Sequence, residues 1–128
     1  MRKTEPGTSP FWDYIGMKEE VIENGYAEVR ITITDHLKQR RGAVHGGVLS
    51  SLVDAAVGSA IRSMLSEEQL SATVELKVNY LRPAFGDYLV AKSKLSHLGR
   101  SIAVGQAEIF DPQDKLVAMG TATYMILK

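Results

Sequence analysis

The chain contains no cysteine among its 128 residues. Disulfides, thiolate nucleophiles and cysteine-based zinc or iron–sulfur sites are therefore excluded, so any nucleophilic chemistry must use oxygen or water. An excess of one charge is also lacking, because 15 basic side chains balance 15 acidic ones. A net charge of zero argues against a nucleic-acid-binding protein, since that affinity comes mainly from a basic surface that neutralises phosphates.

Long hydrophobic runs are missing as well. The N-terminus has no continuous apolar stretch of the signal-peptide type, and the least polar segment, residues 46–61, carries an aspartate and several serines. That segment is too short and too polar to span a bilayer. We therefore expect a cytoplasmic protein with no membrane partner. The three histidines show no spacing typical of metal ligands, so no metal site is predicted.

The length and the 45% hydrophobic content predict one soluble domain that buries about two-thirds of the surface exposed by its unfolded chain. Residues 1–10 are rich in Pro, Gly, Ser and Thr, which predicts a flexible leader before a single domain at residues 11–128. A short helical turn over residues 10–15 is expected, because Pro10 stands where proline is favoured at the start of a helix.

Alternation of apolar and polar residues predicts most of the chain to be β-strand. Asn24-Gly25, a dipeptide typical of two-residue hairpin turns, separates the strands expected at 17–23 and 26–34. Four further strands are expected at about 72–81, 88–97, 101–110 and 116–127. The short turns between them predict hairpins, and therefore antiparallel neighbours.

One long helix is predicted, over about residues 45–65. It is apolar or small around most of its circumference, whereas a helix on the surface shows a polar half. Such a helix must be enclosed. We therefore predict an α+β fold in which a strongly curved antiparallel sheet wraps around one central helix.

The start of this helix carries Gly46 and Gly47 directly after His45. Glycines there leave backbone N–H groups uncovered, and these donors, with the positive end of the helix dipole, favour an oxyanion or a polarised carbonyl. Tight packing of the helix start is the alternative reading of the glycines. For His45 the alternatives are a catalytic role and a hydrogen bond to the backbone that fixes the loop.

Asp54 is the only carboxylate in the predicted helix. Burying an unpaired carboxylate is costly, so its presence requires a reason. It either acts as a general base or nucleophile in a dry cleft, or it faces a solvated gap or pairs with a cation such as Arg62.

Residues 39–54, QRRGAVHGGVLSSLVD, resemble the signature of hotdog-fold acyl-CoA thioesterases, in particular the phenylacetate-degradation (PaaI-type) branch. The similarity continues through residues 72–84, ATVELKVNYLRPA, and covers about residues 20–127. The hotdog fold is a curved antiparallel sheet around a central helix, which agrees with the predicted elements. The resemblance implies hydrolysis of an aryl- or medium-chain acyl-CoA, with coenzyme A as part of the substrate and no separate cofactor.

Position by position, the resemblance implies that Asp54 is the catalytic carboxylate and that the Gly46 N–H, with Gly47, polarises the thioester carbonyl. Gln39 matches an Asn or Gln that helps to bind the carbonyl or the water. Thr73 matches a Ser or Thr that orients the water, although a β-branched residue is also ordinary in a strand.

Two arginines, Arg82 and Arg100, match regions that often contact the pantetheine arm or phosphates of coenzyme A, and Arg41 and Lys128 are weaker candidates. For Arg82 and Arg100 the alternative is a solvated turn residue, which is the more common fate of a charged side chain. The family further implies a homodimer with its site across the interface, and often a homotetramer. A hotdog module that binds or senses acyl-CoA without hydrolysing it is the alternative function.

Overall fold

A computed structural model describes residue 4 and residues 7–127. Lys128 and half of the predicted leader, residues 1–3, 5 and 6, lie outside the described residues. The elements follow one another in the order α1 (Pro10–Ile15), β1 (Met17–Glu23), β2 (Tyr26–Thr32), the 3-10 helix η1 (Asp35–Leu37), α2 (Gly46–Arg62), β3 (Leu70–Tyr80), β4 (Tyr88–Leu98), β5 (Ile102–Phe110) and β6 (Leu116–Leu127).

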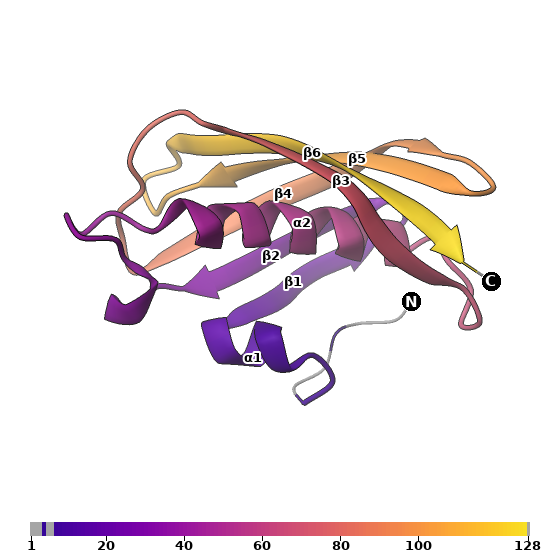
Figure 1. The fold of residues 1–128 in the computed structure, drawn as a ribbon, viewed down its shortest axis with the longest axis horizontal. Coiled ribbons are helices and arrows are strands. Elements are labelled where there is room, and N and C mark those ends of the chain that lie inside the picture. The colour runs from indigo at the N-terminus through magenta and orange to yellow at the C-terminus, as the bar shows by residue number, and fades with distance from the viewer. Residues whose placement is uncertain (1–3, 5–6, 128) are drawn as a thin grey trace.

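The six strands form one antiparallel sheet in the order β1-β2-β4-β5-β6-β3. Figure 1 shows the sheet curving around α2, which runs through its concave side. The α+β arrangement predicted from the sequence is confirmed. Among the described residues, no helix combines the length and the apolar content needed to cross a membrane.

Helix α2 forms the centre of the core, because its apolar residues point to several strands at once. Its fully buried positions include Leu52, Val53, Val57 and Ile61. They share one cluster with inward-facing residues of the sheet, among them Val29, Ile31, Leu89 and Ile109. Burial of a Val, Leu or Ile side chain stabilises a fold by about 1.5–3 kcal/mol, so this helix and the sheet stabilise each other.

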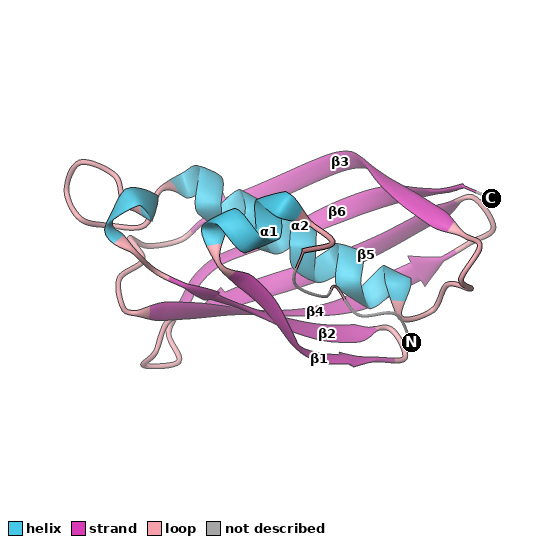
Figure 2. Cartoon of the chain, turned by 90° about the horizontal axis from the view of Figure 1, so that it is seen from below, coloured by secondary structure: helices cyan, strands magenta, loops and turns pink. Residues whose placement is uncertain are grey.

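The hairpin between β1 and β2 has the predicted turn. Asn24 and Gly25 both have positive φ, at 27° and 86°, which is the backbone that an Asn-Gly turn supplies. The short helix at residues 10–15 is also confirmed as α1, which Figure 2 shows in front of α2. Phe11 and Trp12 of α1 line a cavity together with residues of α2. Ile15 of α1 is buried, and Trp12 packs against the core.

One predicted neighbour pair is wrong. The short connection after residue 81 predicted a hairpin of β3 with β4, but β3 pairs with β6 at one edge and β4 pairs with β2 and β5 inside the sheet. The reason is that residues 81–87 form an extended crossover connection, here called the strap, rather than a tight turn. Leu81 N–H donates to Val117 O at 2.9 Å, and Val44 N–H donates to Ala84 O at 2.9 Å. The strap is therefore held by β6 and by the segment before α2.

Candidate functional site

Asp54 lies in the middle of α2, on the side that two strands approach. Its Oδ1 accepts a hydrogen bond from the Thr73 hydroxyl of β3 at 2.9 Å, and the Tyr124 hydroxyl of β6 lies 2.7 Å from the same oxygen. Thr73 and Tyr124 are cross-strand partners, so the pairing of β3 with β6 brings both hydroxyls to one carboxylate oxygen. Asp54 Oδ2 has no hydrogen-bond partner among the described residues, which leaves that oxygen for chemistry.

Tyr124 is only 7% exposed. Burial raises the pKa of its phenol, and the negative charge of Asp54 raises that pKa further. The phenol therefore stays protonated throughout the neutral range and donates to the aspartate, with the Asp54 backbone carbonyl oxygen also 2.7 Å away. Such a donor holds the carboxylate oxygen in one place.

A glycine one helical turn after Asp54 makes this approach possible. A Cβ at Gly58 would lie 2.7 Å from the Tyr124 hydroxyl oxygen, which is closer than van der Waals contact allows. Glycine destabilises a helix interior by roughly 1 kcal/mol relative to alanine. That cost is offset here by the close approach of Tyr124 to the helix.

The start of α2 leaves one backbone donor uncovered. His45 is the N-cap, and its Nδ1 accepts a hydrogen bond from Gly47 N–H at 2.8 Å. This contact fixes the loop, which is the non-catalytic alternative for His45. In the described part of the chain the Gly46 N–H has no acceptor, so it is the amide that a ligand can use.

Tyr80, at the end of β3, packs against Gly46 on its carbonyl side. Its hydroxyl donates to Gly46 O at 3.1 Å and also contacts the Ser50 hydroxyl, and a Cβ at Gly46 would lie 3.4 Å from its ring. A cavity of about 390 Å³ adjoins them. Gln39, Gly46 and Arg82, all predicted from the sequence, line that cavity together with Tyr80.

Asp54 lines a different, smaller cavity of about 150 Å³. Its other walls come from α1, β1, α2 and β6, through Phe11, Trp12, Met17, Ser51, Ala55, Gly58, Arg62 and Tyr124. Eight residues separate Asp54 from Gly46 along α2, which amounts to about 12 Å along the axis and about 80° around it. One chain therefore does not present the Gly46 N–H and the Asp54 carboxylate to the same small group.

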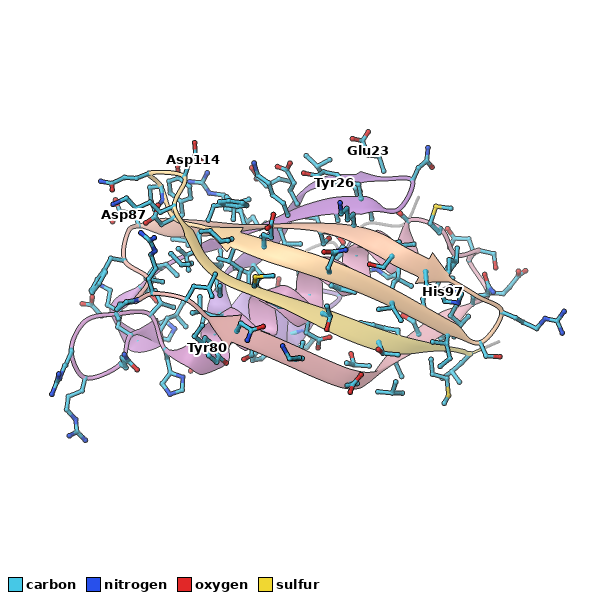
Figure 3. All side chains as sticks on the ribbon, turned by 90° about the horizontal axis from the view of Figure 1, so that it is seen from above. Glu23, Tyr26, Tyr80, Asp87, His97 and Asp114 are labelled. Carbon is cyan, nitrogen blue, oxygen red and sulfur yellow. The ribbon has the colours of Figure 1, made fainter. Side chains whose placement is uncertain are left out.

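The two arginines implied to bind coenzyme A lie far apart. Arg82 N–H donates to Val117 O, whereas Ser101, next to Arg100, accepts from Ile126 N–H. Val117 and Ile126 are nine positions apart along β6, a span of roughly 30 Å. Figure 3 shows the same separation, with Tyr80 and His97 at opposite ends of the sheet. Arg41 is exposed in the loop before α2 and does not line the cavity with Gln39.

The alternative pairing of Asp54 with Arg62 is wrong. Arg62 instead forms an ion pair with Glu19 of β1, whose side chain is 1% exposed. No group of three or more potential metal ligands occurs among the described residues.

Two tyrosines of the candidate site were not predicted from the sequence. Tyr124 binds Asp54, and Tyr80 binds Gly46. Tyr124 reads as one more inward position in an alternating strand, and only the pairing of β3 with β6 brings it to Asp54. The small residue Gly58, one turn beyond Asp54, is the signal that something approaches the helix closely at that point.

Comparison with known proteins identifies the family. The model of the thioesterase superfamily matches residues 41–118. The medium/long-chain acyl-CoA thioesterase YigI of Escherichia coli is 31% identical, over 91% of this chain and 85% of that one. Among solved structures, a conserved protein from Pseudomonas aeruginosa is 35% identical with a TM-score of 0.88, covering 93% of this chain and 94% of that one. A thioesterase family protein from Silicibacter pomeroyi is 30% identical with the same TM-score, covering 93% and 90%.

The chain therefore belongs to the thioesterase superfamily and has its hotdog fold. It is an enzyme of thioester hydrolysis. The resemblance inferred from residues 39–54 and 72–84 is confirmed at this level, while the PaaI-type branch stays a prediction.

Proposed function

We propose that this protein hydrolyses an aryl- or medium-chain acyl-CoA to the free acid and coenzyme A, with Asp54 as its catalytic carboxylate. The observation that carries the proposal is the pair of hydroxyls that bind Asp54 Oδ1. They leave Oδ2 without a hydrogen-bond partner among the described residues, so that this oxygen can act as a base or nucleophile. The relationship to an acyl-CoA thioesterase supports coenzyme A as the leaving group.

The Gly46 N–H is the proposed donor to the thioester carbonyl oxygen. As the carbonyl carbon becomes tetrahedral, negative charge develops on that oxygen, and a fixed amide at a helix N-terminus stabilises it. Gln39, in the same cavity, supplies a side-chain amide for the carbonyl or the water.

Asp54 has two possible roles. As a general base, its Oδ2 takes a proton from water while the water oxygen attacks the carbonyl carbon, and the C–S bond then breaks with the proton passing to the thiolate. As a nucleophile, Oδ2 attacks the carbonyl carbon and expels the thiolate, and water then hydrolyses the mixed anhydride. Thr73, hydrogen-bonded to Asp54, is placed to orient that water.

We further propose that the site forms between two copies of the chain. Strand β3 is an edge strand of eleven residues with β6 on one side only, and it exposes Val74 and Leu76. An unpaired apolar edge of this kind favours pairing with another strand. If two β3 strands pair antiparallel, the Tyr80 end of one lies beside the Thr73 end of the other, which brings Gly46 of one copy toward Asp54 of its partner. A tetramer of such dimers stays a prediction.

Release of free thiol from a panel of acyl-CoAs tests the proposal, with Asp54→Asn beside the wild type. The amide keeps the shape of the carboxylate and an oxygen for Thr73 and Tyr124, but it is neither a base nor a nucleophile at neutral pH. We expect kcat to fall by roughly 10²–10⁴-fold. A wild type that binds an acyl-CoA without releasing thiol would instead identify a binding or sensing module.

A further inference from the structure

The cavity beside Asp54 has both apolar and polar walls. Phe11 and Trp12 of α1 and Met17 of β1 are apolar, and Arg62, the last residue of α2, lines the same cavity. Arg62 is eight residues beyond Asp54, or about 12 Å along the helix. The volume is about 150 Å³. A volume of roughly that size is enough to hold one benzene molecule.

Arg62 is held in place by contacts on a single nitrogen. Its Nη2 binds Glu19, donates to Thr4 Oγ1 at 2.7 Å and lies 3.1 Å from Ser59 Oγ. Glu19 is fixed in turn, because it accepts from the Ser59 hydroxyl at 2.5 Å and from Thr4 N–H at 2.6 Å. The position of the guanidinium is therefore set by β1, α2 and Thr4.

Besides Nη2, the Arg62 guanidinium group carries two further donor nitrogens. Nη1 and Nε have no acceptor in the described part of the chain, and the guanidinium carbon lies 5.9 Å from the centre of the Trp12 ring that walls the cavity. The arginine side chain is 25% exposed. An alkyl chain pressed against it would cover donors without satisfying them, which is unfavourable.

The charges around the cavity favour a neutral acceptor there. Glu19 already balances the charge of Arg62, and Asp54 adds a second carboxylate to the same cavity. A carboxylate on the ligand would bring a third negative charge against one positive charge. A hydroxyl or carbonyl oxygen accepts from Arg62 without that repulsion.

The cavities of about 540, 390 and 240 Å³ are larger, but Asp54 does not line them. The one beside Gly46 shares Arg82 and Pro83 with a neighbouring cavity of about 540 Å³. Lys115, Asp87 and Asp111 also line that neighbour, so this route leads to a charged surface. This route suits the polar arm of the thiol. A third cavity, of about 240 Å³, shares Phe11 and Ser51 with the cavity beside Asp54 but extends toward His36, Lys38 and His45 at the start of α2. The acyl group is assigned to the cavity that Asp54 itself lines.

We propose that Arg62, held by Glu19, is the specificity-determining end of the acyl subsite. It limits the acyl group to about one aromatic ring or six carbons and selects a neutral oxygen acceptor at the far end. This inference rests on the proposed thioesterase function and narrows its substrate class.

The experiment measures kcat/KM for four CoA thioesters: hexanoyl, 6-hydroxyhexanoyl, adipoyl and decanoyl. The first three have equal length and differ only at the far end, where they carry a methyl, a hydroxyl and a carboxylate. We expect wild type to prefer 6-hydroxyhexanoyl-CoA to each of the others by about tenfold or more, the scale on which small pocket differences discriminate substrates.

The double variant Glu19→Gln/Arg62→Leu removes both charges together, because removal of one alone would leave a buried unpaired charge. We expect it to lose the hydroxyl preference and to gain about tenfold or more on decanoyl-CoA. Arg30→Leu is the matched control, since Arg30 lies over the Tyr88 ring away from this cavity. It should keep the wild-type ratios.

Equal wild-type rates on hexanoyl- and decanoyl-CoA, or no preference for the hydroxyl, would overturn the assignment of Arg62 while leaving the thioesterase function intact. Absence of thiol release from all four substrates and from aryl-CoAs would instead overturn the proposed function. The wild-type ratios alone decide the question if the double variant does not fold, which thermal unfolding would reveal.

Discussion

At the scale of single residues, the proposed mechanism uses a backbone amide as well as side chains. Gly46 contributes an N–H that the helix itself does not use, whereas the next amide is already bound to His45. The chemistry proposed for Gly46 therefore needs its nitrogen rather than the absence of its side chain.

Gly46→Pro removes this N–H with little effect on the helix. Proline is favoured at the first helical position, and His45 before it has φ −62° and ψ 139°, which a residue preceding proline readily adopts. We expect kcat to fall by roughly 10²–10³-fold, the cost of losing one oxyanion donor. Gly46→Ala keeps the N–H and is the control. Equal kcat values for the two variants would exclude the amide as the donor.

Tyr124 makes the folding stability of the protein decrease with rising pH in the alkaline range. Its folded pKa lies above the ordinary value of about 10, so its contribution is complete below pH 10 and is lost as the pH rises toward the folded pKa. Tyr26, whose pKa burial and Glu28 raise to about 12, adds a similar loss. We expect the free energy of unfolding in urea to fall between about pH 10 and 12, and to fall less in Tyr124→Phe.

Tyr14→Phe, a change on a ring that is 76% exposed, controls for the loss of a tyrosine as such. If Tyr124→Phe and wild type lose the same free energy over this pH range, Tyr124 does not carry the effect.

At the scale of elements, three pieces of backbone must meet closely for Asp54 to be held. Strand β3 supplies Thr73, β6 supplies Tyr124 and α2 supplies the aspartate. The β3–β6 register shifts between Thr73 and Glu75, a bulge directly beside the site. Bulges turn side chains locally and are frequent near active sites.

Gly58→Ala tests this packing. The added methyl would lie 2.7 Å from the Tyr124 hydroxyl oxygen, so Tyr124 must move and lose its bond to Asp54. We expect a loss of about 1–3 kcal/mol in unfolding free energy, typical of an overpacked site, together with reduced kcat. In Gly58→Ala/Tyr124→Phe the clashing oxygen is gone. That double variant should regain stability relative to Gly58→Ala but keep a reduced kcat.

Independent effects of the two changes on stability would contradict this account, because residues in direct contact are expected to be strongly non-additive. Denaturant unfolding and thiol-release kinetics of wild type, Gly58→Ala, Tyr124→Phe and the double variant give the comparison.

At the scale of the whole molecule, the two halves of the site lie in separate cavities of one chain. The proposed β3–β3 pairing joins them across a two-fold axis. Such an axis makes the two sites of a dimer identical, each using Asp54 of one copy and Gly46 of the other.

Mixing two inactive variants tests this arrangement. Asp54→Asn and Gly46→Pro chains, combined by co-refolding, give dimers in which one site carries both defects and the other carries none. At equal amounts, about a quarter of the sites should be intact if the dimers are two-fold symmetric and assort at random. Recovered thiol release near that level supports the shared site. Recovery no greater than the sum of the separate variants would place both groups in one chain.

The sequence by itself determined the elements and marked the residues proposed for the site. Alternation marked the strands, the apolar circumference of residues 45–65 required an enclosed helix, and Asn24-Gly25 specified its turn, since each depends on local backbone preference and burial. The isolated Asp54 and the glycines at the helix start can likewise be recognised from the amino-acid sequence alone.

The tertiary structure decided what pairs with what. The position of β3 beside β6, the ion pair of Arg62 with Glu19 and the bond of Tyr124 to Asp54 all join residues at least 38 positions apart. Such contacts depend on which strand reaches which edge and on the space beside Gly58. Local propensity carries no information about either, because both arise only when the whole sheet closes around the helix.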